Sequence, residues 1–255
     1  MQLYSKIQGN GEDILLLHGL FGSHENLGVI QRHLVNRGYR VHGIDLRNHG
    51  RSFWSDIMDY PTMASDILAY MNEKKLESAS LIGHSMGGKV AMQLTLDHPD
   101  RICKLVIIDI APVTYLPSHN NELRGMSALD IENLSTRQEA DGQLKRLVPE
   151  LPIRQFLLKN LRPRNNWGYQ WRINLTAITH AYRNILNGID PSTIPCINPA
   201  LFLKGEASAY IQTEHHAAIK QFFPHYQLAC IPGARHWLHV DAPQAVCQHI
   251  THFIE

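Results

Sequence analysis

Six short apolar runs, separated by stretches of helical character, constrain the fold of this chain more than any other feature of its sequence. The apolar runs cover residues 14–17, 39–44, 79–82, 105–110, 200–204 and 227–231, and the helical stretches cover residues 26–36, 64–73, 88–96 and 244–254. Most of the apolar runs lack alternating polar residues, as expected for strands that are buried on both faces. The alternation of strand and helix therefore predicts a doubly wound, mostly parallel α/β sheet.

This alternation stops between Pro112 and about Gly188, where helical signals occur with no strong strand between them. Pro152 occupies a position suited to the first turn of a helix, and the apolar residues after it fall on one helical face. A second helix is predicted from a cap at Asn174 to a stop at Gly188. The segment is therefore predicted to be a helical insertion into an α/β domain.

The place of this insertion in the chain indicates a lid. Ligands of doubly wound sheets bind beyond the carboxyl ends of the strands, where a helical excursion would form a roof. We therefore expect residues 1–112 and 191–255 to form the core and residues 113–190 to form the lid. The insertion has ten Lys and Arg against seven Asp and Glu, which weakly favours an anionic leaving group such as coenzyme A. A solvated helical surface is the alternative explanation of these charges.

Composition narrows the class of partner. The 255 residues carry 24 Lys and Arg against 23 Asp and Glu, a formal net charge of +1, so there is no electrostatic basis for binding nucleic acid or an anionic membrane. The four cysteines form no CxxC pair, which indicates buried thiols rather than a zinc site or disulfides. The N-terminus shows no leader pattern and no apolar run is long enough to span a bilayer. We expect a cytoplasmic protein with a small-molecule substrate, no metal and no obligate protein partner.

The sequence GHSMG, residues 83–87, matches the pattern GxSxG with Ser85 at its centre. It follows an apolar run and precedes a helical stretch, which is the context of a nucleophile elbow. In such an elbow the two glycines let the neighbouring backbones pass without a Cβ clash, and the serine is exposed at the carboxyl edge of the sheet. The alternative is an ordinary strand-to-helix turn whose serine caps the helix.

An oxyanion hole needs two backbone N–H donors that converge on the developing negative charge. The amide of Met86 would come with the elbow. The sequence LLLHGLFGS, residues 15–23, places a turn directly after an earlier strand, so the amide of Leu20 is the predicted second donor and that of Phe21 is the fallback.

A serine hydroxyl also needs a base that takes its proton. His236 follows the last apolar run across a Pro-Gly turn and would return to the same edge of the sheet. His239, three residues later, is the competing base. Trp237 and Phe21 are candidates for an apolar wall around an acyl chain, with core packing as the alternative.

Five motifs occur in the order LLLHGLFGS, GIDLRNHGRS, IGHSMGG, IDIAP and PGARHW. Together they resemble the α/β-hydrolase superfamily, and most closely its branch of small bacterial esterases, over nearly the whole chain. The resemblance implies a catalytic triad that acts through an acyl-enzyme without a metal or an organic cofactor.

The acid of that triad has two candidates. The superfamily usually places it after the penultimate strand, but this chain has Ser208 three residues after Gly205, where a GxxD arrangement would put aspartate, and only Glu206 remains. Asp109 ends the buried run one strand beyond the nucleophile, an alternative acid position within the superfamily. Because a charge is seldom left in a buried strand without a partner, we predict that Asp109 accepts the Nδ1 proton of His236, with Glu206 as the alternative.

The predicted function is a serine hydrolase, a carboxylesterase or thioesterase, that cleaves carboxylic esters or acyl thioesters. Two other functions are open on the same fold. One is a carbon–carbon bond hydrolase, or a lyase of menaquinone synthesis, that uses the same triad. The other is a non-catalytic receptor for a small ligand, although a receptor has less need of a serine, a histidine and an acid together.

Overall fold

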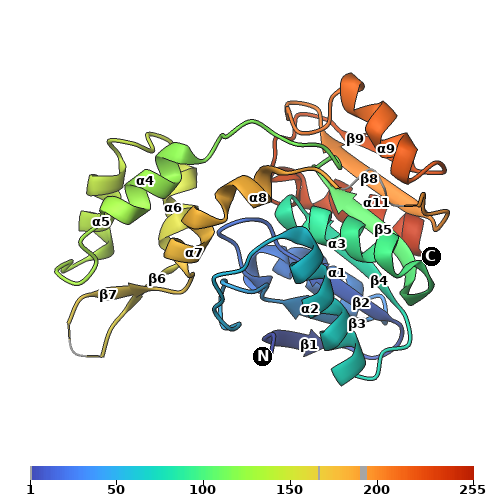
Figure 1. The fold of residues 1–255 in the computed structure, drawn as a ribbon, viewed down its shortest axis with the longest axis horizontal. Coiled ribbons are helices and arrows are strands. Elements are labelled where there is room, and N and C mark those ends of the chain that lie inside the picture. Colours follow the sequence, from blue (N-terminus) through green and yellow to red (C-terminus); the bar gives the residue numbers. More distant parts are fainter. Residues whose placement is uncertain (1, 166, 190–193) are drawn as a thin grey trace.

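The computed structural model describes residues 2–165, 167–189 and 194–255. A seven-stranded sheet with the order β1-β3-β2-β4-β5-β8-β9 forms its centre (Figure 1). The strands are β1 (Ser5–Gln8), β2 (Asp13–Leu17), β3 (Arg40–Ile44), β4 (Ala79–His84), β5 (Ile102–Ile108), β8 (Ala200–Gly205) and β9 (Gln227–Ile231). All pairs are parallel except β1 with β3. The predicted doubly wound, mostly parallel sheet is therefore confirmed.

Helices cover both faces of this sheet. Apolar residues of α1 (Gly28–Val35) and α11 (Pro243–Ile254) pack on one face, and those of α2 (Tyr60–Glu73), α3 (Met86–Asp97) and α9 (His216–Phe222) pack on the other. Along β2, Ile14 and Leu16 contact the first set of helices while Leu15 and Leu17 contact the second, as the two-residue period of a strand requires. Both faces are buried, which is why these strands are apolar throughout. The remaining short helices of the core are η1 (His24–Leu27), η2 (Pro99–Arg101), η3 (Thr213–His215) and α10 (Leu238–Asp241).

The insertion leaves the sheet after β5 and returns to it before β8, and it projects to one side in Figure 1. It contains α4 (Asn120–Ala128), α5 (Arg137–Leu144), α6 (Leu151–Leu158), α7 (Leu175–His180) and α8 (Tyr182–Leu186), with a hairpin of β6 (Leu161–Pro163) and β7 (Tyr169–Trp171). Pro152 lies in the first turn of α6, and Asn174 caps α7 by accepting the amide hydrogen of Ala177. The helix predicted up to Gly188 is instead two short helices that meet at Ala181. The boundary predicted at residues 190 and 191 lies outside the described residues.

Three further details differ from the sequence prediction or add to it. The edge strand β1 was not predicted, because it is polar and mostly accessible and so lacks the apolar signal of its neighbours. Cys196 and Cys247 are buried as expected, but Cys103 and Cys230 are exposed, since they lie at the start of β5 and on the outer face of the edge strand β9. Within the described ranges, no helix has the length and apolar character needed to cross a bilayer.

Candidate active site

Ser85 occupies a sharp turn between β4 and α3. Its φ of +52° lies in the left-handed region, and its side chain makes no hydrogen bond to the helix that follows, so the alternative of a simple capping serine is wrong. A Cβ on Gly83 would lie 2.3 Å from the carbonyl oxygen of Gly87, and a Cβ on Gly87 would lie 2.3 Å from that of Leu17. Only glycine fits at both positions, and the tight turn this allows presents the serine at the carboxyl edge of the sheet.

A continuous chain of hydrogen bonds runs from Ser85 to Asp109. The Oγ atom of Ser85 lies 3.0 Å from Nε2 of His236, and Nδ1 of the same ring lies 2.8 Å from Oδ2 of Asp109. Asp109 is fully buried just after β5, with a φ of +55°. Its carboxylate also accepts the amide hydrogen of Gly205, at 3.0 Å, and the hydroxyl hydrogen of Ser208. Three donors therefore hold this carboxylate in one orientation.

The alternative acid, Glu206, and the competing base, His239, take no part in this chain of hydrogen bonds. The carboxylate of Glu206 accepts the amide hydrogen of Gly233 at 2.8 Å and is exposed. Ser208, at the position where the superfamily would place aspartate, instead donates its hydroxyl hydrogen to Asp109. His239 is buried against the ring of His84 at 4.7 Å, and its Nδ1 has no hydrogen-bond partner among the described residues.

Two residues that the sequence analysis did not single out hold His236 in place. The ring of Tyr210 stacks on the ring of His236, with centroids 3.8 Å apart and an interplanar angle of 21°. Behind it, Nε2 of His84 donates a hydrogen bond of 3.0 Å to the carbonyl oxygen of His236. Burial holds the pKa of His84 well below its usual value, so the neutral ring has one N–H, which it gives to this carbonyl. The place of His84 inside GHSMG could have marked it as a residue of the site, whereas nothing in the sequence around Tyr210 indicated its contact with His236.

The loop after β2 lies directly against Ser85. A Cβ on Gly19 would lie 3.2 Å from the Cβ of Ser85, so the amides of Leu20 and Met86 come from segments that flank the serine. Neither amide donates a hydrogen bond within the part of the chain that the structure describes. The amide of Phe21, by contrast, donates to Nε2 of His49 at 3.2 Å. The two predicted donors therefore remain unoccupied, and the fallback donor is already engaged.

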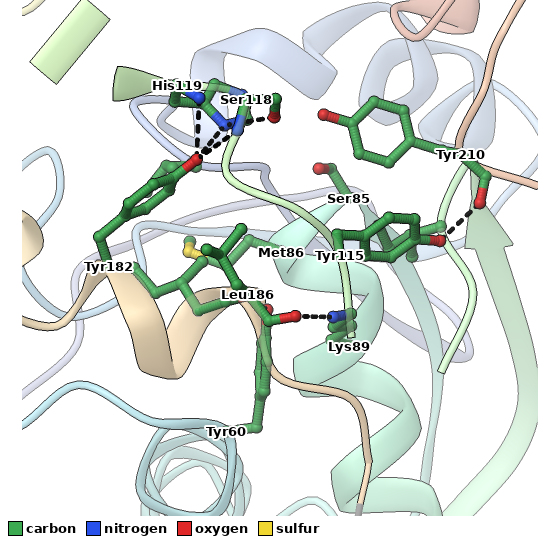
Figure 2. A pocket seen from close by; sticks show the side chains of 13 residues that line it. Tyr60, Ser85, Met86, Lys89, Tyr115, Ser118, His119, Tyr182, Leu186 and Tyr210 are labelled. Carbon is green, nitrogen blue, oxygen red and sulfur yellow. Dashed lines mark hydrogen bonds between the residues drawn. The ribbon is translucent and has the colours of Figure 1, made fainter. Parts of the chain in front are cut away.

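A small cavity opens beside the serine (Figure 2). Ser85 points into it, with the rings of Tyr115 and Tyr210 beside the serine and with Tyr60 and Lys89 farther away. Its free volume is only about 30 Å³, and thirteen residues line it: Leu20, Tyr60, Ser85, Met86, Lys89, Ile110, Tyr115, Ser118, His119, Tyr182, Ile185, Leu186 and Tyr210. Six of them belong to the insertion.

The two aromatic residues predicted for an acyl-chain wall are not part of this lining. Trp237 packs on the ring of Phe156 in α6, with centroids 5.0 Å apart. Phe21 is buried, and its ring lies 6.0 Å from that of His119. Both side chains pack against the insertion, whose course the sequence did not reveal, so neither forms part of the cavity wall.

Comparison with known proteins identifies the family. A family model described as "alpha/beta hydrolase fold" matches residues 14–243. This chain belongs to the α/β-hydrolase family. Esterase YbfF of Escherichia coli (strain K12) is 37% identical over 97% of this chain and 94% of that protein. The sn-1-specific diacylglycerol lipase ABHD11 of Danio rerio is 38% identical over 99% of this chain and 82% of that protein. A solved structure titled "Marine microorganism esterase" superimposes with a TM-score of 0.96 at 40% identity and covers 99% of both chains.

These likenesses confirm the predicted resemblance of this α/β hydrolase to small bacterial esterases. The described residues contain no group of three or more His, Cys, Asp or Glu side chains that could hold a metal ion. The polar groups of the site are instead arranged around one serine, one histidine and one buried carboxylate.

Proposed function

We propose that this α/β hydrolase cleaves carboxylic esters or acyl thioesters through an acyl-enzyme on Ser85. The observation that carries the proposal is the unbroken chain of hydrogen bonds from Asp109 through His236 to Ser85, beside the amides of Leu20 and Met86, which donate to none of the described residues. A non-catalytic receptor has no need of this arrangement. The names of the relatives, which are esterases and a lipase, support an ester bond over a carbon–carbon bond or a lyase reaction.

In the first half of the reaction, Oγ of Ser85 attacks the acyl carbon while Nε2 of His236 takes the hydroxyl proton. Asp109 keeps the remaining ring proton on Nδ1, so that the basic nitrogen faces the serine, and its charge stabilises the imidazolium that forms. The amides of Leu20 and Met86 donate to the oxyanion, and each such donor typically contributes about a hundredfold to turnover. His236 then protonates the leaving alcohol or thiol.

In the second half, a water molecule replaces the leaving group. His236 takes a proton from this water as it attacks the acyl-enzyme carbonyl, and the same two amides hold the second oxyanion. Collapse of this intermediate breaks the bond to Oγ, Ser85 regains its proton from His236, and the carboxylic acid leaves.

The insertion serves as the lid of this site, with residues 113–190 as its extent. The six residues that the insertion contributes to the cavity lining support this role, because they border the same cavity as Ser85. The excess of positive charge on the insertion supports a preference for anionic leaving groups such as coenzyme A. Acetyl-coenzyme A and p-nitrophenyl acetate, compared at low and high ionic strength, test that preference; equal salt responses would remove it.

Labelling with a fluorophosphonate tests the reaction centre directly. Peptide mass spectrometry is expected to find one adduct, at Ser85, in the unmodified protein and none in Ser85→Ala. Ser65→Ala, which removes an exposed hydroxyl from α2, is the matched control and should label like the unmodified protein. An adduct at another serine, or none at all, would falsify the proposal. A burst of p-nitrophenol in the first turnover would report the acyl-enzyme.

A further inference from the structure

Lys89 lies one helical turn after Ser85 on α3 and is almost completely buried, with 1% of its surface exposed. Its Nζ donates to the carbonyl oxygens of Val113 at 2.8 Å, Leu186 at 3.2 Å and Asn187 at 2.5 Å. An ammonium group has three protons, so each proton has one acceptor. The group is therefore fully engaged with backbone and is not free to bind a substrate.

The three acceptors belong to the two places where the chain passes between the core and the insertion. Val113 lies on the outgoing connection after β5, whereas Leu186 ends α8 and Asn187 begins the returning connection. The connections also bond to each other, through the amide of Tyr115 to the carbonyl of Leu186 at 3.0 Å and the amide of Gly188 to the hydroxyl of Thr114 at 2.9 Å. Lys89 thus ties both connections to the helix that begins at the nucleophile.

These contacts form a wall between two cavities. Lys89, Tyr60 and Leu186 lie at the end of the first cavity opposite Tyr210 (Figure 2). A second cavity, of about 400 Å³, lies next to the same segments and is lined by Asp59, Tyr60, Pro61, Gln93, Thr114, Asn184, Asn187, Gly188 and Ile189. Tyr60 lines both cavities, and Gln93 follows Lys89 by one turn of α3. Lys89 lines the first cavity and its acceptor Asn187 lines the second, so this hydrogen-bonded cluster lies between the two spaces.

The two volumes differ in what they can hold. Ligand pockets usually measure about 300–1,000 Å³, so the space beside Ser85, at about 30 Å³, accepts only a small acyl group. The second cavity falls within the usual range. With the wall in place, a longer acyl chain that enters at Ser85 cannot reach it.

We propose that Lys89 is a specificity-determining residue that limits the acyl chain to a short one by closing the end of the pocket opposite Tyr210. The inference rests on the proposed ester hydrolysis at Ser85. It assigns short-chain esters and thioesters as the substrate class, and it assigns the second cavity as the space that a longer chain would occupy if the wall were opened.

The charge of Lys89 suits this closing role better than an apolar side chain would. Burial lowers its pKa to about 7, while the three carbonyl oxygens stabilise the protonated form. The ring of Tyr60 on α2 lies 5.3 Å from Nζ and the ring of Tyr115 on the outgoing connection lies 4.9 Å from it. No carboxylate pairs with it among the described residues. An ammonium can join three carbonyls at one point, which no apolar side chain can do.

The test compares kcat/KM for p-nitrophenyl acetate, butyrate, octanoate and dodecanoate. We expect the unmodified protein to prefer the two short esters over octanoate by roughly tenfold or more in kcat/KM. A single methylene group that does not fit an apolar pocket typically lowers kcat/KM by at least about this factor. Lys89→Ala is expected to raise the octanoate-to-acetate ratio by roughly tenfold. Leu186→Ala opens the same wall and keeps the lysine, so it should shift the ratio in the same direction if Lys89→Ala fails to fold.

Lys104→Met is the matched control, because Lys104 also donates to two backbone carbonyls, those of Phe253 and Ile254, but lies far from the insertion. It should leave the chain-length ratio unchanged. Equal use of all four esters by the unmodified protein, or an unaltered ratio in both wall variants, would overturn the assignment. Fluorophosphonate labelling of Ser85 in the same samples distinguishes an error in the role of Lys89 from an error in the proposed function. If the proposed function were wrong, the unmodified protein would not be labelled at Ser85.

Discussion

Replacing Asp109 with asparagine changes one atom of the side chain, the Oδ2 that accepts hydrogen bonds from His236 and Ser208. The remaining oxygen can still accept the amide hydrogen of Gly205, so the buried side chain keeps its place. The new NH₂ group, however, donates where the carboxylate accepted. His236 must then present an unprotonated Nδ1 to it and carry its proton on Nε2, the atom 3.0 Å from Oγ of Ser85.

The wrong tautomer cannot take the serine proton, and the charge that stabilises the imidazolium is lost as well. In serine triads this exchange lowers turnover by about ten-thousandfold, which corresponds to about 5 kcal/mol of transition-state stabilisation. We expect a loss of this order in kcat for Asp109→Asn, with little change in KM.

Steady-state hydrolysis of p-nitrophenyl acetate measures the effect, and thermal unfolding shows whether the variant is folded. Glu206→Gln is the matched control, because it makes the same chemical change on an exposed carboxylate that accepts the amide hydrogen of Gly233 and makes no hydrogen bond with His236 or Ser85 in the described part of the chain. It should retain full activity. A folded Asp109→Asn within about tenfold of the unmodified protein, or an inactive Glu206→Gln, would refute the assignment of the acid.

Three further predictions concern stability. Gly87→Ala should lower the free energy of unfolding by about 2 kcal/mol or more, because its Cβ would lie 2.3 Å from the carbonyl oxygen of Leu17; chemical denaturation with a loss under about 1 kcal/mol would contradict this. Burial raises the pKa of Asp45, but hydrogen bonds from His24 and Arg51, together with the nearby ring of His18, outweigh it and bring the pKa from 3.8 to about 2. Asp45→Asn should therefore cost about 2 kcal/mol at pH 7, and the difference should vanish as the pH falls from about 4 to about 2; a pH-independent difference would be inconsistent with this. Burial lowers the pKa of His239 from 6.5 to about 4, so the unfolded chain binds the proton more readily and stability should fall as the pH drops through this interval. His239→Gln should show a shallower decline in the same denaturation series, and identical slopes would exclude the effect.

The parts of the fold that could be predicted from the sequence are the strands whose side chains are buried on both faces of the sheet. The central strands are apolar along their whole length because helices cover both faces, and this leaves a pattern that needs no tertiary information. The edge strand β1 and the hairpin of β6 and β7 have mixed burial and left no such pattern. The break at Ala181 depends on how α7 and α8 pack against the rest of the insertion.

The proposed reaction centre could be predicted from the sequence for a related reason. In a parallel sheet the carboxyl ends of the strands share one edge, so Ser85, Asp109 and His236 could be placed together from strand ends alone. The choice between Asp109 and Glu206 rested on burial of a charge, and the structure adds the donors that hold the buried one.

Lys89, Tyr210 and the cavity lining were not predictable, because their partners lie on connections whose path depends on long-range packing. The same dependence explains why Trp237 and Phe21 were misplaced. Each side chain packs against a residue of the insertion and is absent from the lining of the cavity.

Ser85 and Asp109 directly follow two neighbouring strands, β4 and β5, that are joined through α3. The nucleophile, one oxyanion amide and the acid of the proposed mechanism therefore belong to a single strand–helix–strand unit. The base, in contrast, follows β9, the last strand of the sheet to be made. As the chain leaves the ribosome, the serine is present long before anything can activate it. On the proposed mechanism, a growing chain is therefore inactive towards esters until its final strand has docked beside the earlier ones.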